Sequence, residues 1–385
     1  MTSRARICLL GALVIAGGAL ASAPAARRSP QGPPPTGELT ADETRKLLGP
    51  GFGVTRTERF AIISDGDPAW TRGTGRLLER TSRAFERFMD RMGFEPVEPQ
   101  APLVCVLIRD HAMFEAFALA SDGVRTGWMG GYYATHSNRI VFFDSSTAPA
   151  FEAASRRVDE MDEQAETARR RAEIARRERR VEEARVYRAL ADRVREESRG
   201  SRDRLAEQSQ RASQAKTAHE ASHLLSFNMG MQSRVHQYPF WLSEGLAACF
   251  EPADDEAADR GRLGPDYENP LRESEFRSAL AAEELVPLEA LVEMSAAPAN
   301  DERAARAMYA QAYALFRYLY QHERDALAAL FRDIASEPPG MISPRRQGEL
   351  FRARFGDAGA LERRWLREAA PRALAGVNQP DDDSQ

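Results

Sequence analysis

No proline occurs between Ala150 and Tyr238, and this long stretch limits what the chain can fold into more than any other feature. Within residues 152–210, 16 of the 59 side chains are basic and 15 are acidic. Proline interrupts helices, and so charged a segment has little apolar surface to bury. The stretch therefore predicts a long helix whose charged side chains are solvated.

A seam of small apolar residues runs along the first half of this stretch. Its members recur three and four residues apart, as they do in a coiled coil: Val158, Met161, Ala165, Ala168, Ala172 and Ala175. The spacing fails where Arg179 and Glu182 occupy the next seam positions. Gly200 is the residue at which we expect the helix to break and fold back as a hairpin.

Residues 150–216 are thus expected to form a charged helical insertion, similar to a coiled coil, between two lobes of the protein. Two roles stay open for it. It is either an intramolecular insertion with solvated charges or an arm that docks on a partner or on a second copy of the chain.

The N-terminus has the pattern of an export signal. Arg4 and Arg6 precede an apolar run, and Ala19-Leu20-Ala21 fits the small-x-small cleavage pattern, so residues 1–21 are predicted to be a signal peptide. The apolar run is short for a membrane span, so we expect a mature protein outside the cytoplasm with no stable span. Localisation in the periplasm, in the cell envelope or outside the cell fits equally well.

The remaining chain divides into segments of different character. Residues 22–54 begin as a proline-rich linker and end in a short helix, for which Thr40 and Glu43 form a capping box. Residues 55–149 alternate strand and helix patterns and end in a hairpin that turns at His136 to Asn138. Residues 217–255 follow the insertion, 256–370 read as amphipathic helices, and 371–385 as a disordered acidic tail. The predicted fold class is α+β, with a small mixed sheet and a C-terminal helical lobe.

Composition excludes some functions. The net charge is −5 and the pI is about 5.9, whereas a nucleic-acid-binding surface needs a basic excess, so no nucleic-acid partner is expected. Beyond the signal peptide only Cys105 and Cys249 remain. We expect two buried free thiols, although a disulfide would be possible in an oxidising compartment.

The segment HEASH, residues 219–223, has the spacing of a metal site. On a helix, His219 and His223 are four residues apart and project from one face, so both imidazoles can bind one ion. Glu220 lies beside the first histidine and could take a proton from a metal-bound water. Zinc suits imidazole and carboxylate ligands and is the predicted cofactor.

A third ligand is expected in the next helix, which the sequence PFWLSEGLAACFE predicts. Glu244 lies early in this helix and would complete a set of two histidines and one glutamate, with water as the fourth ligand of a catalytic zinc. Glu251, two turns further on, could support the site from behind, but we interpret it as a surface carboxylate.

These motifs resemble those of the gluzincin metallopeptidases, in particular the aminopeptidase-N-like branch, in which Trp-Leu precedes a ligand glutamate and a glycine. They resemble even more closely a bacterial peptidase-MA-like family of unknown function whose members are mostly exported. The resemblance covers roughly residues 55–148 and 217–370 and implies a zincin-like fold. It implies that His219, His223 and Glu244 bind zinc and that Glu220 is the general base.

The resemblance also implies a catalytic tyrosine. Tyr309 lies in a helix that is similar to the one carrying this residue in the aminopeptidase-N-like enzymes, and its hydroxyl would stabilise the oxyanion. Tyr309 could instead be an ordinary core aromatic, while Tyr313 and His236 are weaker alternatives for the oxyanion contact.

One departure from the family limits the expected specificity. The segment from Gly127 to Tyr132 contains no acidic residue, whereas those aminopeptidases place there a glutamate that holds the substrate's free amine. Its glycines could let a substrate backbone pair with the strand edge.

The sequence therefore predicts an exported zinc metallopeptidase that acts on peptide or protein substrates and is not an amino-exopeptidase. Hydrolysis of a non-peptide amide or ester would use the same residues. The other hypothesis is an inactive zincin-fold protein that holds a structural zinc, with His236 as a fourth ligand, and binds an envelope partner through its helical insertion.

Overall fold

The structure is a computed structural model that describes residues 39–127, 129–298 and 301–377. Its contacts divide the chain into two compact units. The hairpin unit is Ser145–Ser213, and the core unit contains the described residues of 39–144 and 214–377. The predicted signal peptide and most of the proline-rich linker lie outside the described residues.

A mixed five-stranded sheet forms one part of the core unit. Its strand order is β1-β2-β3-β5-β4, in which β2, β3 and β5 are parallel and β1 and β4 run antiparallel to their neighbours. The strands are β1 (Gly53–Arg56), β2 (Phe60–Ser64), β3 (Leu103–Ile108), β4 (Gly131–Ala134) and β5 (Arg139–Phe143). The sequence predicted all of these except β1, whose four residues are mostly exposed and carry no apolar pattern. The fold class α+β is confirmed.

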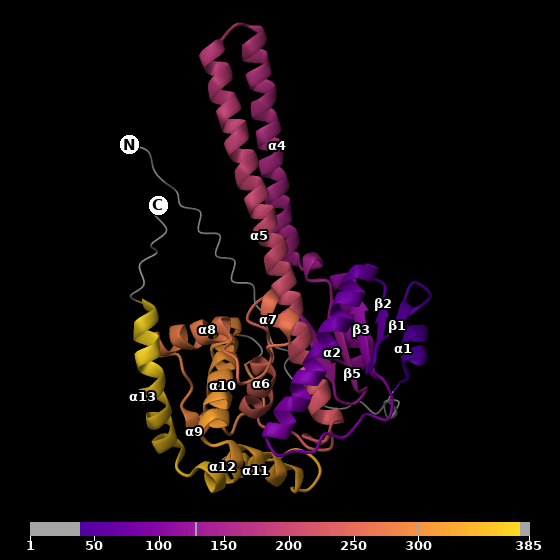
Figure 1. The fold of residues 1–385 in the computed structure, drawn as a ribbon, viewed down its shortest axis with the longest axis vertical. Coiled ribbons are helices and arrows are strands. Elements are labelled where there is room, and N and C mark those ends of the chain that lie inside the picture. Colours follow the sequence, from indigo (N-terminus) through magenta and orange to yellow (C-terminus); the bar gives the residue numbers. More distant parts are fainter. Residues whose placement is uncertain (1–38, 128, 299–300, 378–385) are drawn as a thin grey trace. The chain divides into compact units, whose positions relative to one another are not determined.

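The central strand is apolar on both sides because both faces of the sheet are covered. All six residues of β3 are buried. Helix α2 (Pro68–Arg91) packs against β2 of the sheet (Figure 1), and its fully buried Phe85 and Phe88 contact the ring of Phe250. It begins at Pro68 because Asp67 caps its N-terminus by accepting hydrogen bonds from Ala69 and Trp70.

The strand hairpin at residues 131–143 was predicted correctly, and a buried ion pair lies next to its turn. Asn138 adopts a left-handed conformation, with φ of 50°, in the turn. Arg139 donates two hydrogen bonds to Asp122, at 2.7 and 3.2 Å, and both side chains are almost fully buried. Burial raises the pKa of Asp122, but hydrogen bonds from His136 and Arg139 outweigh this effect and lower it to about 2.

Helices form the rest of the core unit. Helix α10 packs against α6 and α8 and is buried along most of its length (Figure 1). The helices are α1 (Ala41–Leu48), α3 (His111–Phe117), α6 (Phe240–Cys249), α7 (Asp255–Arg260), α8 (Pro270–Ala281), α9 (Leu288–Leu291), α10 (Glu302–His322), α11 (Arg324–Ala335), α12 (Pro344–Phe355) and α13 (Ala358–Val377). A π-helical turn, Ala118–Asp122, continues α3, and a 3-10 turn, Ser145–Thr147, precedes the hairpin unit. The capping box of Thr40 and Glu43 is present at α1.

The C-terminal helix extends past the predicted lobe boundary at residue 370. Helix α13 continues to Val377, so part of the segment expected to be a disordered tail is helical. Residues 378–385 lie outside the described part of the chain.

The hairpin unit consists of α4 (Pro149–Arg177) and the first part of α5 (Val181–Asn228), which run side by side (Figure 1). Helix α5 continues from this unit into the core unit. The predicted break at Gly200 is wrong, since this residue lies inside α5. The chain turns instead at Glu178–Arg180, where Arg179 has a left-handed φ of 60°. The turn falls where the seam pattern failed.

The predicted seam in α4 is confirmed within the hairpin unit. Val158, Ala165, Ala168, Ala172 and Ala175 are buried, whereas Met161 is half-buried. A matching seam on α5 contains Ala184, Ala191 and Ser198, and the Ser198 hydroxyl donates to Asp162 at 2.6 Å. Because the seam side chains are small, the two helices can approach closely and exclude water without large apolar residues.

Two further predictions concern thiols and membranes. Cys105 and Cys249 are both free and buried, as expected. Among the helices in the described residues, none combines the length and the apolar character that spanning a bilayer would require.

We predict that Asp122→Asn lowers the free energy of unfolding by about 3–5 kcal/mol at pH 7, because Arg139 loses its buried counter-charge. The lowered pKa of Asp122, about 2 instead of 3.8, contributes about 2 kcal/mol of stability that is present above pH 4. This contribution is lost as the pH falls from about 4 to 2. Denaturant unfolding at several pH values should therefore show a smaller acid-dependent loss in the variant. Asp259→Asn, which breaks an exposed ion pair with Arg80, is the control and should change stability by less than about 1 kcal/mol.

Candidate metal centre

The residues of HEASH lie in the last four turns of α5, where this helix is buried on all sides. Ala218, Ala221, Leu224 and Leu225 are fully buried around the two histidines. The one serine of the motif is satisfied locally, because the Ser222 hydroxyl donates to the carbonyl of Ala218 at 2.7 Å. The site is thus enclosed by buried side chains of this part of α5.

The strand hairpin holds the end of this helix. The ring of Phe227 stacks on Tyr133 of β4 with 5.5 Å between the ring centroids. The side-chain amides of Asn138 and Asn228 exchange hydrogen bonds at 2.8 and 2.9 Å. These contacts link the β4–β5 turn to the last turn of α5 and thereby fix the orientation of the histidine-bearing face.

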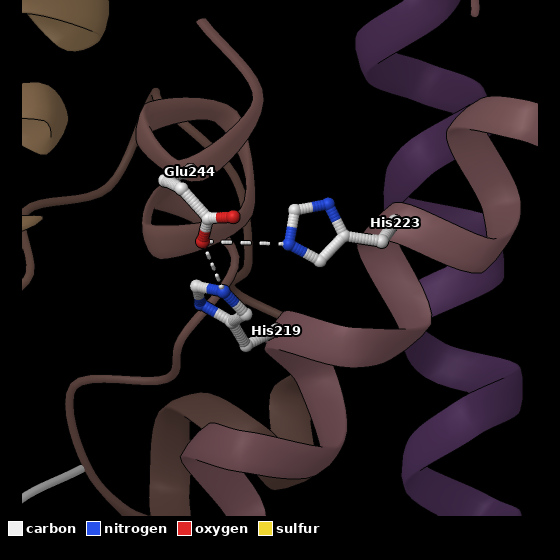
Figure 2. A group of neighbouring side chains, drawn as sticks. All are labelled: His219, His223 and Glu244. Carbon is white, nitrogen blue, oxygen red and sulfur yellow. Dashed lines mark hydrogen bonds and ion pairs between the residues drawn. The ribbon is translucent and has the colours of Figure 1, made fainter. Parts of the chain in front are cut away.

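Glu244 is brought to the two histidines by α6, as the sequence predicted. Its Oε2 atom lies 3.1 Å from His219 Nε2 and 3.6 Å from His223 Nε2 (Figure 2). His219, His223 and Glu244 form a group whose ligand atoms all lie within 4.8 Å of one another. The three side chains are at most 1% exposed.

The geometry suits a small divalent cation. Donor atoms around a tetrahedral zinc, each about 2.0–2.1 Å from the ion, lie roughly 3.3 Å apart, which is close to the observed separations. In addition, His223 Nε2 is buried without a hydrogen-bond partner. A buried polar atom in this condition is costly unless it has another role, such as metal binding. His219, His223 and Glu244 are therefore able to hold a metal ion.

The prediction that Glu251 lies on the surface is wrong. This carboxylate is buried and accepts a hydrogen bond from His219 Nδ1 at 2.9 Å. Arg272 of α8 donates to both of its oxygens at 2.8 and 2.9 Å, and Asn269 donates at 3.1 Å. Glu251 thus fixes the His219 ring from behind so that the Nε2 atom points at Glu244.

Arg272 was not identified from the sequence, although it completes this network. Glu251 lies seven residues after Glu244, and although α6 ends at Cys249, this spacing could have indicated that both carboxylates face the same side. Arg272 had no comparable signal, because it comes from a different helix and the chain contains many arginines. Only the packing of α8 against α10 reveals its position.

The electrostatics of the site follow from its burial and from three carboxylates. Burial opposes protonation of His219, but Glu244 and Glu251 outweigh it and raise the pKa of this histidine to about 10. Burial likewise raises the pKa of Glu244, but His223 and His219 lower it to about 2. Arg272 keeps the pKa of Glu251 below its usual value in spite of burial. The same negative charge that favours a proton on His219 would favour a divalent cation.

Tyr309 of α10 lies beside the three candidate ligands His219, His223 and Glu244, which we call the metal group. Its ring centroid is 6.5 Å from that of His219, and its hydroxyl is buried without a hydrogen-bond partner. Burial and the charges of Glu244 and Glu220 raise the pKa of Tyr309 well above its usual value, so the phenol stays protonated. A neutral, unpartnered hydroxyl is a hydrogen-bond donor.

The two alternatives to Tyr309 do not fit. The Tyr313 hydroxyl accepts a hydrogen bond from the Asn269 backbone at 2.9 Å and thus supports the start of α8. His236 Nε2 is within 2.7 Å of the carbonyl oxygen of Glu337, and His236 is not part of the metal-ligating group. Glu220, in contrast, is buried beside the metal group, and its charge contributes to the raised pKa of both His219 and Tyr309.

The close packing of α6 on α10 explains why a glycine, Gly245, follows the ligand glutamate. A Cβ atom at this position would lie 2.4 Å from the carbonyl oxygen of Ala312 and 2.8 Å from Phe316 Cβ. Only glycine therefore lets α6 and α10 approach so closely. This contact sets the distance between the Glu244 helix and the Tyr309 helix.

One of the glycines near β4 has a packing role. A Cβ atom at Gly131 would lie 2.4 Å from the Phe142 ring, so this glycine is needed for packing against β5. All four β4 residues are buried, and β4 is the last strand of the sheet and pairs only with β5. Trp128 lies outside the described residues.

Comparison with known proteins identifies one family. Residues 213–340 match the model of a family described as a protein of unknown function (DUF1570). The matched range contains the three candidate ligands, Glu220, Glu251 and Tyr309, and it starts where the hairpin unit ends. No curated protein and no solved structure matches the chain.

We expect the purified protein to bind one equivalent of zinc and His223→Ala to lose most of it, because two ligands do not retain the ion. Inductively coupled plasma mass spectrometry after dialysis against excess weak chelator measures this. His322→Ala removes an exposed histidine and is the matched control. Retention of full zinc by His223→Ala would contradict the ligand assignment.

The Glu251–His219 contact gives a second prediction. Glu251→Gln should weaken zinc binding about 10–100-fold, because the His219 ring loses the charged group that orients it. Competition with a fluorescent chelator measures the affinity, and circular dichroism checks that the variant folds. Glu256→Gln on α7 lies in an exposed position and should leave the affinity unchanged. Equal affinity of the two variants would show that Glu251 has only a packing role.

Proposed function

We propose that this chain is an exported zinc-dependent metallopeptidase of the gluzincin type with a zincin-like fold. The observation that carries the proposal is the convergence of three side chains able to bind one ion with two groups suited to hydrolysis. His219, His223 and Glu244 lie within 4.8 Å, and Glu220 and Tyr309 are buried beside them. A set of two histidines and one glutamate leaves a coordination position for water or substrate.

Zinc in such a set would polarise the substrate carbonyl and lower the pKa of water to about 7. The remaining steps belong to side chains of this chain. Glu220 accepts a proton from the attacking water while the water oxygen forms a bond to the carbonyl carbon. Glu220 then delivers that proton to the leaving nitrogen as the C–N bond breaks. One water is consumed, and a carboxylic acid and an amine are produced.

Tyr309 would act on the oxygen of the attacked carbonyl. The negative charge that develops there needs a donor that is in place before the reaction, and a buried hydroxyl without another partner meets this requirement. The raised pKa of Tyr309 keeps its proton on the oxygen. Glu251 and Arg272 act through His219, whose ring they orient.

The proposal of a peptide substrate draws on a groove in the core unit. It is lined in part by Tyr133, Phe227, Arg234 and Tyr238, and Phe227 follows His223 by about one helical turn on α5. Aromatic walls and a cationic side chain suit an extended peptide with mixed side chains. We assign the approach of the substrate to this groove. The acid-free segment before β4 favours cleavage of internal bonds over removal of N-terminal residues.

One observation favours a second candidate, a metal-stabilised protein without catalytic activity. Each of the five site residues is at most 1% exposed, whereas a catalytic zinc must be reached by its substrate. In this alternative the ion would stabilise the packing of α5 against α6. The partner-binding role would then belong to another surface of the chain.

A peptide-library digest that compares wild type with Glu220→Gln distinguishes the two candidates. Glutamine has the shape of glutamate but cannot accept the proton, so we expect zinc content to be retained and turnover to fall by at least 100-fold. Mass spectrometry of the products gives the bond preference. Glu256→Gln, the same change at an exposed position, should cleave like wild type.

The outcomes separate the candidates. Wild-type activity no higher than that of Glu220→Gln would support the non-catalytic protein. Tyr309→Phe tests the oxyanion role and should lower kcat by about 10²–10³-fold without loss of zinc.

A further inference from the structure

Large apolar side chains are exposed at the apex of the helical hairpin, which we define as residues 169–190. Of the eleven large hydrophobic residues that are exposed in the described chain, four lie there: Ile174, Val181, Val186 and Leu190. Their exposures are 50, 60, 65 and 43%. The remainder of the hairpin unit has none, so the exposed apolar surface of this unit is confined to its apex.

Three of these side chains share one flank of the hairpin. Arg171 of α4 lies over the ring of Tyr187 of α5, with 5.8 Å from its Cζ atom to the ring centroid. Ile174 follows Arg171 by three residues, and Leu190 follows Tyr187 by three and Val186 by four. Residues three and four apart lie on the same helix face. Leu190 and Tyr187 also line one groove between the helices. Ile174, Val186 and Leu190 therefore form an aliphatic strip on this flank, next to a groove that Glu160, Glu163 and Arg171 also line.

The apex is also the most basic part of the hairpin. Residues 169–188 contain nine arginines and four glutamates, a net charge of +5. Residues 150–168 contain two arginines and six acidic residues, a net charge of −4. All four apex glutamates already form ion pairs with neighbouring arginines, for example Glu173 with Arg176 and Arg177. The unmatched charge at the apex is positive.

From this combination we propose that the hairpin apex binds an anionic lipid surface. Aliphatic side chains that enter the boundary between headgroups and acyl chains, together with arginines that contact lipid phosphates, are what interfacial binding requires. Helix α4 has 29 residues, which at 1.5 Å per residue makes an arm roughly 45 Å long with this surface at its end. The arm would tie the protein to a membrane through this surface.

Charge and apolar area argue against a second copy of the chain as the occupant. Contact between two apices would bring +5 against +5. Antiparallel contact would pair the acidic residues 150–168 with the basic apex, but no large apolar side chain is exposed in 150–168 to meet the aliphatic strip. Nucleic acid would match the arginines and leave the aliphatic side chains without a counterpart.

Vesicle co-sedimentation tests the proposal. The chain from Ser22 onward is used, so that the apolar N-terminal segment cannot itself bind lipid. Vesicles of phosphatidylcholine with 30% phosphatidylglycerol should bind the protein at least tenfold more tightly than pure phosphatidylcholine vesicles. Binding should weaken as salt rises, since the arginines act through screened charge.

Two variants with matched controls locate the contact. The triple change Arg169→Gln, Arg179→Gln and Arg188→Gln should lower binding at least tenfold, whereas Arg193→Gln, Arg199→Gln and Arg204→Gln, outside the basic tract, should lower it less than threefold. Ile174→Ser with Val186→Ser should also lower binding at least fivefold. Leu47→Ser with Leu271→Ser, at exposed positions of the core unit, should not. All changed residues are exposed at the surface, and circular dichroism verifies that each variant remains helical.

Three results would overturn the proposal. The first is equal sedimentation of wild type and apex variants. The second is tight binding to a 30-base-pair DNA duplex that depends on the arginines but not on Ile174 and Val186, without vesicle binding. The third is a dimer in light scattering that the serine changes dissociate, again without vesicle binding. None of these outcomes involves zinc or turnover, so the test is independent of the proposed hydrolysis.

Discussion

The contact between His219 and Glu251 determines how the His219 ring is oriented in the candidate metal centre. A histidine on a buried helix can rotate about its side-chain bonds, and either of its two ring nitrogens can bind a metal until the other is engaged. Glu251 engages Nδ1, and Arg272 and Asn269 hold Glu251 in turn. The Nε2 atom is then left to face Glu244. The packing of α8 therefore acts on the site through a single imidazole.

The sequence was sufficient for the parts of this site that local periodicity determines. The positions of His219 and His223 on one helix face follow from the helical repeat, and Glu244 followed from a helix whose start was visible at Pro239 and Phe240. The full set of residues that orients His219 could not be predicted from the sequence, since Arg272 is brought there by tertiary packing. Glu251 was misassigned because charge usually indicates exposure, and here a second buried charge reverses that rule.

The same division holds for the fold. Apolar strands such as β3 and the capping box at Thr40 were evident, whereas β1 has no apolar pattern and is present because it pairs with β2. In the hairpin, the failure of the seam at Arg179 indicated the turn more reliably than Gly200 did. A glycine costs a solvated helix little, and the change of register left Arg179 to adopt the left-handed conformation. The chain reverses direction between α4 and α5 at the point where the small seam residues that hold the two helices together end.

Gly245 makes two features of the site inseparable. The missing side chain lets α10 rest on α6, and these two helices carry the donor hydroxyl of Tyr309 and the carboxylate of Glu244. The distance between the Tyr309 hydroxyl and the Glu244 carboxylate is thus set by a single contact between two helices. A relative of this chain with a larger residue at this position would have to shift both groups together. The ligand set and the donor are expected to change as a pair during divergence, even though 65 residues separate them in the sequence.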